Sequence, residues 1–265
     1  MPAFHFGDSE RPLFAHYHPA VGAVGARPAV LICGPIGEEG IRAHRMLRVL
    51  AERLARAGAP TVRFDYGGAG DSAGACEDLS FSTMAADIVA AHEEMMDMSC
   101  APRAIWIGLR LGASAAIRAA QRVPRGPAGV ILWDPVVDGR DYLASLAAAH
   151  ADMGLPAAAE PDPGDLSEGP TEALGFALSM RLREELLAME LGDLKRKPTR
   201  RALIVAGAAT PEMESLETAL ARLEVIVDKR HDGGEAGWNS DEALNSYYVP
   251  IRTISALVEA VETWR

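Results

Sequence analysis

The chain has 265 residues, of which 49% are apolar and 24% are charged, a composition typical of one sizeable globular domain. A net charge of −11 argues against nucleic acid as a partner, because phosphate contacts need clustered lysines and arginines. Cys33, Cys76 and Cys100 lack metal-ligand spacing, which favours a cytoplasmic protein without a disulfide framework, metal or cofactor. The N-terminal stretch has no signal-peptide pattern, and no apolar run is long enough to span a bilayer.

In chain order, short apolar or alternating runs predict strands, and stretches whose apolar residues recur every 3.6 residues predict helices. The two kinds of element alternate along the chain. The expected elements are an antiparallel hairpin over 2–8 and 12–20, a strand over 28–33, a helix over 44–58, a strand over 59–64, a helix over 82–98 capped by Ser82 or Thr83, a strand over 105–107, a helix reaching Arg122, a strand over 128–134, a strand over 201–209, a helix over 211–223, a strand over 223–230 and a helix over 254–264. Such alternation predicts the α/β class, with a doubly wound and mostly parallel sheet.

Residues 140–198 interrupt this alternation. We expect helices over 141–155 and 171–191, separated by a loop rich in proline, glycine and acidic residues. An insertion at this point of such a sheet commonly lies over the active-site end as a lid. The predicted organisation is therefore a core made of 1–139 and 199–265, with 140–198 as a helical lid.

The stretch IWIGLRLGASAA, residues 105–116, has the outline of a strand that turns sharply into a helix. In the motif G-x-S-x-G, the middle residue of this turn is a nucleophilic serine. Here the middle residue is Arg110, whose guanidinium stays protonated and is not a nucleophile.

Three stretches carry a resemblance to a known family: CGPIGEEG (33–40), RFDYGGAGDSAG (63–74) and GLRLG (108–112). In this order they resemble the oxyanion loop, the R-F-D-x-x-G-x-G-D-S segment and the nucleophile elbow of the α/β-hydrolase fold. The resemblance is to serine-aminopeptidase-like members. More narrowly, GLRLGA, WDPVVDGRDYL and GWNSDEAL look like the hydrolase-like proteins of bacterial exosortase and exopolysaccharide gene neighbourhoods.

The resemblance implies a serine, a histidine and an acid, and two of these are replaced. Trp238 stands where the histidine belongs, so the remaining candidate base is His231 at the end of the last strand. Asp134, after the strand over 128–134, is an alternative position for the acid. Ser114 lies one helical turn beyond the elbow and is expected to pack rather than react. Cys33 at a strand end is a weaker candidate nucleophile.

The oxyanion hole looks intact in the sequence, with backbone N–H groups of Ile36 or Gly37 and of Leu111 as the expected donors. Arg110 at a helix N-terminus favours an anionic ligand such as a carboxylate or phosphate. Alternatively, Arg110 pairs with Asp134, Asp65 or Glu38 and fills the pocket. Cys33, Trp238 and Asn239 are expected to line the same pocket.

Three hypotheses follow. The chain is a hydrolase-fold protein that has lost serine chemistry and binds an anionic or acyl small molecule. Alternatively, it is an active hydrolase or acyltransferase with a rearranged site, in which His231 and Asp134 act and Arg110 clamps the substrate. In the third, it is a scaffold, a homodimer or a partner in an envelope-polysaccharide pathway, whose lid face presents Phe176, Leu178, Met180, Leu182 and Leu186.

Overall fold

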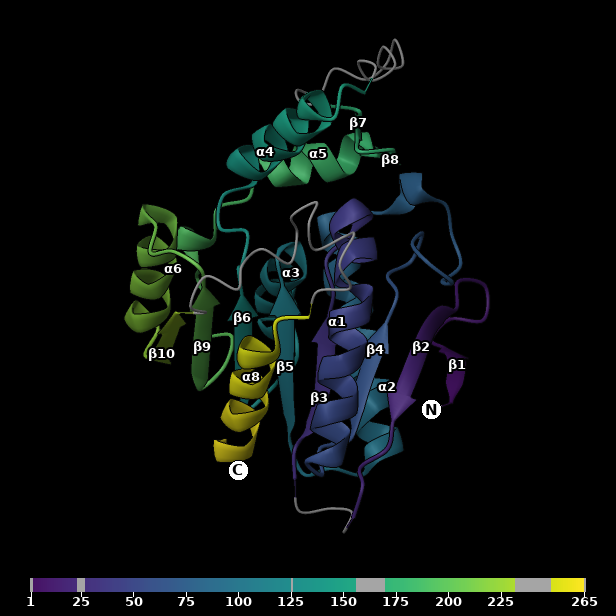
Figure 1. Ribbon diagram of the computed structural model, residues 1–265, viewed down its shortest axis with the longest axis vertical. Helices are drawn as coiled ribbons and strands as arrows, with labels where there is room; N and C mark the ends of the chain where they lie inside the picture. The colour runs from purple at the N-terminus through teal and green to yellow at the C-terminus, as the bar shows by residue number, and fades with distance from the viewer. Residues whose placement is uncertain (1, 23–26, 125, 156–169, 232–248, 265) are drawn as a thin grey trace.

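The computed structural model describes residues 2–22, 27–124, 126–155, 170–231 and 249–264 (Figure 1). Its main sheet has eight strands in the order β1-β2-β4-β3-β5-β6-β9-β10 within these residues. Only the pairs β1–β2 and β2–β4 are antiparallel. The strands are β1 Ala3–Phe6, β2 Leu13–His18, β3 Ala29–Cys33, β4 Thr61–Phe64, β5 Ala104–Leu109, β6 Gly129–Trp133, β9 Arg201–Ala206 and β10 Ile226–His231. The prediction of a mostly parallel α/β sheet is confirmed.

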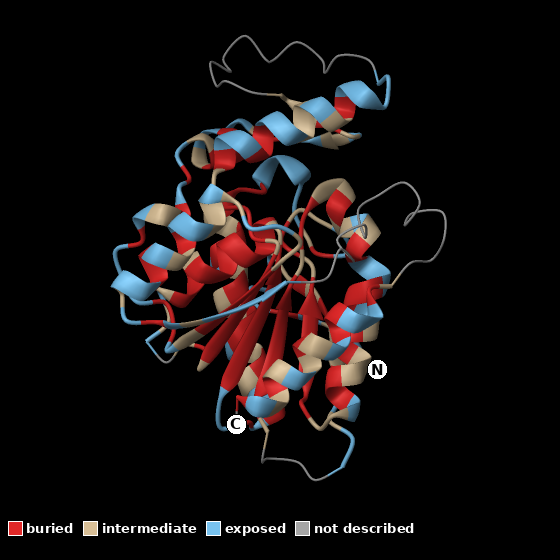
Figure 2. Cartoon of the chain, turned by 60° about the vertical axis from the view of Figure 1, so that its left-hand side comes forward, coloured by how far each residue is buried: buried red, intermediate tan, exposed pale blue. Residues whose placement is uncertain are grey.

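Helices cover both faces of this sheet. They are α1 Gly37–Arg56, α2 Phe81–Ser99, α3 Leu111–Ala120, α6 Pro211–Arg222 and α8 Ile251–Thr263. One apolar cluster joins the sheet to α1 and α8, and the other joins it to α2, α3 and α6. The central strands β3, β4, β5 and β6 are buried, and the helices turn their exposed residues outward (Figure 2).

Several helices begin earlier than their apolar period indicates, and α1 does so by the most residues. The first was expected from residue 44, but α1 starts at Gly37, where Glu38 and Glu39 occupy the first turn and suit the positive end of the helix dipole. The predicted cap of α2 is wrong, because Ser80 is the N-cap and its hydroxyl accepts from the Thr83 N–H.

The segment between β6 and β9 forms a separate layer at the end of the sheet to which the strands point (Figure 1). It contains α4 Gly139–Asp152, β7 Glu172–Ala173, β8 Phe176–Ala177 and α5 Met180–Leu187, and we call it the insert. The predicted helix over 171–191 is wrong in its first part. Leu174 and Gly175 have φ of 53° and 85°, and these two residues form the tight turn of a β7–β8 hairpin.

The two ends of the insert are tied together in a stem. Asp138 and Glu190 form an antiparallel bridge, the Gly139 N–H donates to the Met189 carbonyl, and the Leu191 N–H donates to that of Val137. The insert therefore leaves and re-enters the core at neighbouring points, near 138 and 190.

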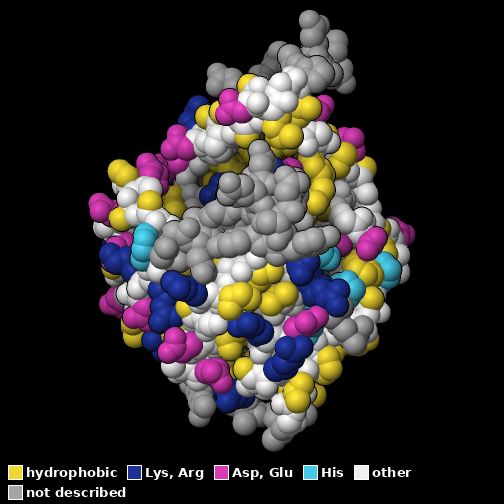
Figure 3. All heavy atoms as spheres, in the orientation of Figure 1, with side chains coloured by type: hydrophobic (Ala, Val, Ile, Leu, Met, Phe, Trp, Pro, Cys, Tyr) yellow, Lys and Arg dark blue, Asp and Glu magenta, His cyan; other side chains and the backbone are white. Residues whose placement is uncertain are grey.

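The surface over α1 and α8 carries basic and acidic side chains interspersed (Figure 3). Several are paired, such as Arg48 with Glu52 and Arg230 with Glu259. Within the described ranges, no helix is long and apolar enough to cross a membrane. The same residues contain no group of three or more His, Cys, Asp or Glu placed to hold a metal ion.

Candidate functional site

The elbow predicted from GLRLG is present in the structure. Arg110 lies between β5 and α3 with φ 53° and ψ −126°, a conformation that is costly for any residue with a side chain. A Cβ on Gly108 would lie 2.3 Å from the Ala113 Cα, and one on Gly112 would lie 2.1 Å from the Gly34 carbonyl oxygen. The elbow is thus pressed against its own helix and against the loop after β3, so both positions require glycine.

The side chain of Arg110 is held by the two elements that face the elbow. Its Nε donates to Oε1 of Glu39, in the first turn of α1, at 2.8 Å. Oε2 of the same carboxylate accepts from the Tyr142 hydroxyl, on α4, at 3.0 Å. Arg110 Nη1 donates to the Asp134 carbonyl oxygen at 3.3 Å. The elbow, α1 and the insert therefore meet in one network, which we call the Arg110–Glu39–Tyr142 cluster.

This cluster is charge-balanced and partly dry. The Arg110 side chain is 24% exposed and that of Glu39 is 10% exposed. Burial lowers the pKa of the Arg110 guanidinium, but Glu39, through its charge and its hydrogen bond, together with Tyr142 and Asp134, raises it more, so the net shift is upward. Burial, and then Glu39, raise the pKa of Tyr142, so its hydroxyl remains a donor. The sequence suggested Asp134, Asp65 or Glu38 as the partner of Arg110, but Glu38 pairs with Arg42 instead.

The nearest hydroxyl and thiol are engaged or buried. Ser114 is fully buried, and its hydroxyl donates to the Val136 carbonyl oxygen. Cys33 is also fully buried, which raises the pKa of its thiol and keeps it protonated. Both residues lie in the core beside the elbow, as a packing role requires.

The two candidates for a rearranged site stand on different strands. Asp134 follows β6 with φ 42°, and its Oδ1 accepts from the Gly207 N–H at 3.3 Å. His231 ends β10 and is exposed. Trp133 pairs with Val205 and His231 with Ala206, so β9 lies between the two candidates and their backbones are about 10 Å apart. Trp238 and Asn239 lie outside the described residues.

The expected oxyanion donors stand where two helices begin. Ile36 precedes α1, Gly37 opens it with φ +60°, and Leu111 opens α3. The first N–H groups of a helix have no partner inside it, so both starts offer backbone donors. The insert reaches this point, because the Phe176 ring lies 3.6 Å from where a Cβ on Gly37 would be.

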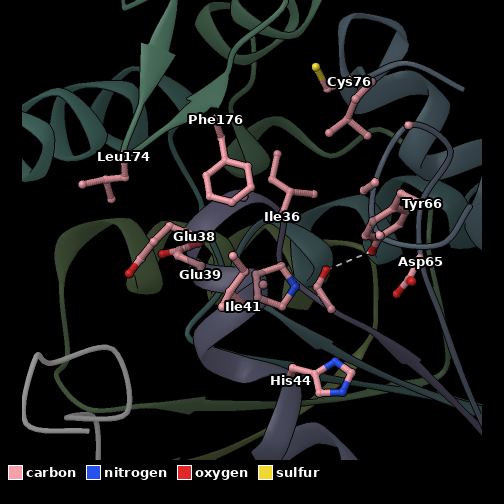
Figure 4. A pocket seen from close by; sticks show the side chains of 18 of the residues that line it. Ile36, Glu38, Glu39, Ile41, His44, Asp65, Tyr66, Cys76, Leu174 and Phe176 are labelled. Atoms are coloured by element: carbon pink, nitrogen blue, oxygen red, sulfur yellow. Dashed lines mark hydrogen bonds between the residues drawn. The ribbon is translucent and has the colours of Figure 1, made fainter. Parts of the chain in front are cut away.

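A cavity of about 820 Å³ opens beside the cluster, between α1, the loop after β4 and the insert (Figure 4). Phe176 points from the insert toward Ile36, with Asp65 and Tyr66 on the far side. The Tyr66 hydroxyl donates to the Gly34 carbonyl oxygen at 3.1 Å. Glu39 and Tyr142 line the cavity, whereas Arg110 and Cys33 are not among its lining residues. No local pattern in the sequence marks Glu39, Tyr66, Tyr142 or Phe176 as part of this cavity.

The GGAGDS segment forms one wall of the cavity and is held by its own turn. Asp65 Oδ2 accepts from the Asp71 N–H at 3.0 Å. The Ser72 hydroxyl donates to the Asp65 carbonyl oxygen at 2.6 Å and accepts from the Phe14 N–H at 2.8 Å. This bonding agrees with the structural role that such a turn motif predicts.

The Arg110–Glu39–Tyr142 cluster lies within the part of the chain that a protein-family model matches. Residues 26–161, about half of the chain, match the family described as serine aminopeptidase, S33. This range contains the loop after β3, the elbow and Asp134. A search of curated proteins finds no match.

Solved structures show the same fold over the whole chain. Est1E from Butyrivibrio proteoclasticus, with bound ferulic acid, is 18% identical with a TM-score of 0.67, covering 99% of this chain and 97% of that one. Alpha/beta hydrolase domain-containing protein 10 from mouse is 15% identical with a TM-score of 0.61, covering 100% of both chains. Proline iminopeptidase from Mycobacterium smegmatis is 13% identical with a TM-score of 0.58, covering 99% and 98%. At these identities the likeness is one of fold alone.

Proposed function

The chain belongs to the serine aminopeptidase S33 family, and from this premise we propose that it has exchanged serine catalysis for the non-covalent binding of a small molecule. One observation carries the proposal. The apex of the elbow, where the nucleophile of such a fold stands, holds an arginine whose charge is taken up by Glu39.

The state of the other reactive groups supports this proposal. Acyl transfer needs a nucleophile, a base within hydrogen-bond reach of it and an oriented acid. Ser114 and Cys33 are fully buried, and β9 separates Asp134 from the exposed His231. No pair among these residues has the geometry that an activated nucleophile requires.

The cavity supports the binding half of the proposal. Its volume of about 820 Å³ falls in the range of small-molecule sites, which are largely apolar with a few polar groups. Ile36, Leu79, Leu146 and Phe176 supply apolar walls. Of the ligands expected from the sequence, an acyl chain suits these walls, and an aryl body fits them equally well.

The scaffold hypothesis is less well supported by the insert. Leu178, Leu182 and Leu186, three of the five residues expected on its partner-binding face, are buried inside the molecule. Met180 is 45% exposed. Most of this face is therefore not available to a partner.

The catalytic half is tested with a fluorophosphonate probe and a nitrophenyl ester. We expect no labelling of the native protein, and ester turnover no faster than with the heat-denatured chain. Labelling that disappears in Ser114→Ala, or turnover that disappears in His231→Ala, would overturn the proposal.

The binding half is tested by thermal shift with 3-phenylpropan-1-ol, a neutral aryl compound. We expect the melting temperature of the native protein to rise and that of Leu146→Trp, which fills part of the cavity, to stay constant. Leu187→Trp is the matched control, because Leu187 is partly buried but does not line the cavity. An equal shift in both variants would place binding elsewhere.

A further inference from the structure

The polar end of the cavity presents a carboxylate rather than a cation. Glu39 and Tyr142 stand in the cavity wall, and Arg110 lies behind the Glu39 carboxylate. Each Glu39 oxygen receives one hydrogen bond within the cluster, and a carboxylate oxygen can accept a second. A ligand that approaches the elbow from the cavity therefore meets a carboxylate first.

Most of the other charged side chains that line the cavity have the same sign as Glu39. Carboxylates at Glu38, Asp65 and Asp71 line the cavity, and Arg63 is its only lining arginine or lysine among the described residues. Arg63 is buried, and its Nε donates to His18. The electrostatic potential in such a cleft favours a cation over an anion.

The apolar walls limit where this charge acts. Phe176 and Ile36 stand over the start of α1, beside Glu39 (Figure 4). A ligand that uses both features has an aryl or alkyl body against these side chains and a small polar head toward the carboxylate. A charged head in a partly dry site binds tightly only when the opposite charge is beside it.

We infer that the cavity selects an amphiphilic primary amine, with Glu39 as the residue that determines this specificity. The inference rests on the proposed function and gives it a ligand class. It reverses the sign expected from Arg110 alone, because the arginine serves to position Glu39. An ammonium head donates to the Glu39 carboxylate, whereas a carboxylate head faces it with like charge.

Three compounds with one body and different heads test the inference: 3-phenylpropylamine, 3-phenylpropan-1-ol and 3-phenylpropanoate. Their affinities are measured by isothermal titration calorimetry at pH 7. We expect the amine to bind the native protein about tenfold or more tightly than the carboxylate, with the alcohol between them.

Glu39→Gln provides the decisive variant. It removes the carboxylate and leaves the Arg110 charge without its partner, so we expect the order of the amine and the carboxylate to reverse. Glu52→Gln is the matched control, because it removes a carboxylate on the same helix that is paired with Arg48 and does not line the cavity. It should keep the native order.

The outcomes separate this inference from the proposed function. A native protein that prefers 3-phenylpropanoate, or that does not discriminate among the heads, overturns the amine specificity and leaves non-covalent binding intact. Failure of all three compounds to bind counts against both, whereas ester turnover overturns only the loss of catalysis. Should Glu39→Gln not fold, as judged by circular dichroism, the affinity order of the native protein decides alone.

Discussion

Arg110 occupies a backbone conformation that any L-residue finds costly, so its retention depends on what the side chain gains. Arg110→Met keeps the backbone cost and removes the ion pair with Glu39, which leaves a largely buried carboxylate with Tyr142. We expect the free energy of unfolding to fall by about 2 kcal/mol, measured by urea denaturation.

A double-mutant cycle separates this pair from its surroundings. Glu39→Gln alone should also destabilise, and the double variant should lose less than the sum of the two single losses, because the pair is broken only once. Strictly additive losses would show that Arg110 and Glu39 do not stabilise each other.

His18 makes the stability of the folded chain depend on pH. It is buried, and burial together with the nearby Arg63 lowers its pKa from 6.5 to about 4. Between these values the unfolded chain binds a proton that the folded chain does not, so stability is lost as the pH falls from 6.5 toward 4. Denaturation at several pH values should show a smaller slope in this window for His18→Gln. An unchanged slope would assign the effect to other groups.

At this scale the sequence identified the position of Arg110 but not its partner. Glu38 and Glu39 are adjacent, and neighbouring residues point about 100° apart around a helix. Only the orientation of α1 against the elbow decides that Glu39 faces Arg110 and Glu38 faces Arg42. Tyr142 could not be foreseen either, because it reaches the cluster from the insert, whose placement no local pattern contains.

At the scale of elements, α5 is fastened to the start of α2. The Glu185 carboxylate accepts from the Ser82 N–H and hydroxyl, each at 2.7 Å, and the Ser179 hydroxyl donates to the Leu79 carbonyl oxygen at 2.8 Å. A carboxylate at a helix N-terminus also interacts favourably with the helix dipole.

Glu185→Ala should therefore loosen the insert more than the core. We expect faster limited proteolysis within residues 139–190, with a loss of about 1 kcal/mol in global stability. Glu184→Ala is the control, because Glu184 is exposed on the same helix and, within the described residues, its side chain makes no hydrogen bond or ion pair. Equal cleavage rates in the two variants would contradict a fastening role for Glu185.

Periodicity located the elements of the core but misplaced some of their ends. The spacing of apolar residues does not reveal the first turn of α1, because Glu38 and Glu39 mark the start of this helix instead of apolar residues. It also read the β7–β8 hairpin as helix, because two strands of two residues are too short to show a period of their own.

At the scale of the whole molecule, the order of strands and helices was predictable because each element of the α/β core carries a clear apolar pattern. The limits of the predicted lid stay a prediction. The expected limits of 140 and 198 followed the end of one strand and the start of another, whereas the bridged stem lies at 138 and 190. Hydrogen bonds between segments that lie far apart in the sequence leave no mark on local composition.

Removal of the insert tests its place in the molecule. Replacing residues 139–189 by a short Gly-rich linker should keep the β-sheet signal in circular dichroism but abolish binding of 3-phenylpropan-1-ol. Because Leu182 and Leu186 no longer cover the core, we expect a stability loss of at least about 3 kcal/mol. Unchanged binding would show that the cavity does not need the insert.

The bridged stem also bears on how such a protein can diversify. Two chain crossings that sit side by side allow a whole cassette to be exchanged, lengthened or shortened while the sheet beneath keeps its strand pairing. A single recombination event can then place a different insert over the same sheet. Chimaeras that graft foreign cassettes between Asp138 and Glu190 would let an engineer vary the ligand while retaining one scaffold.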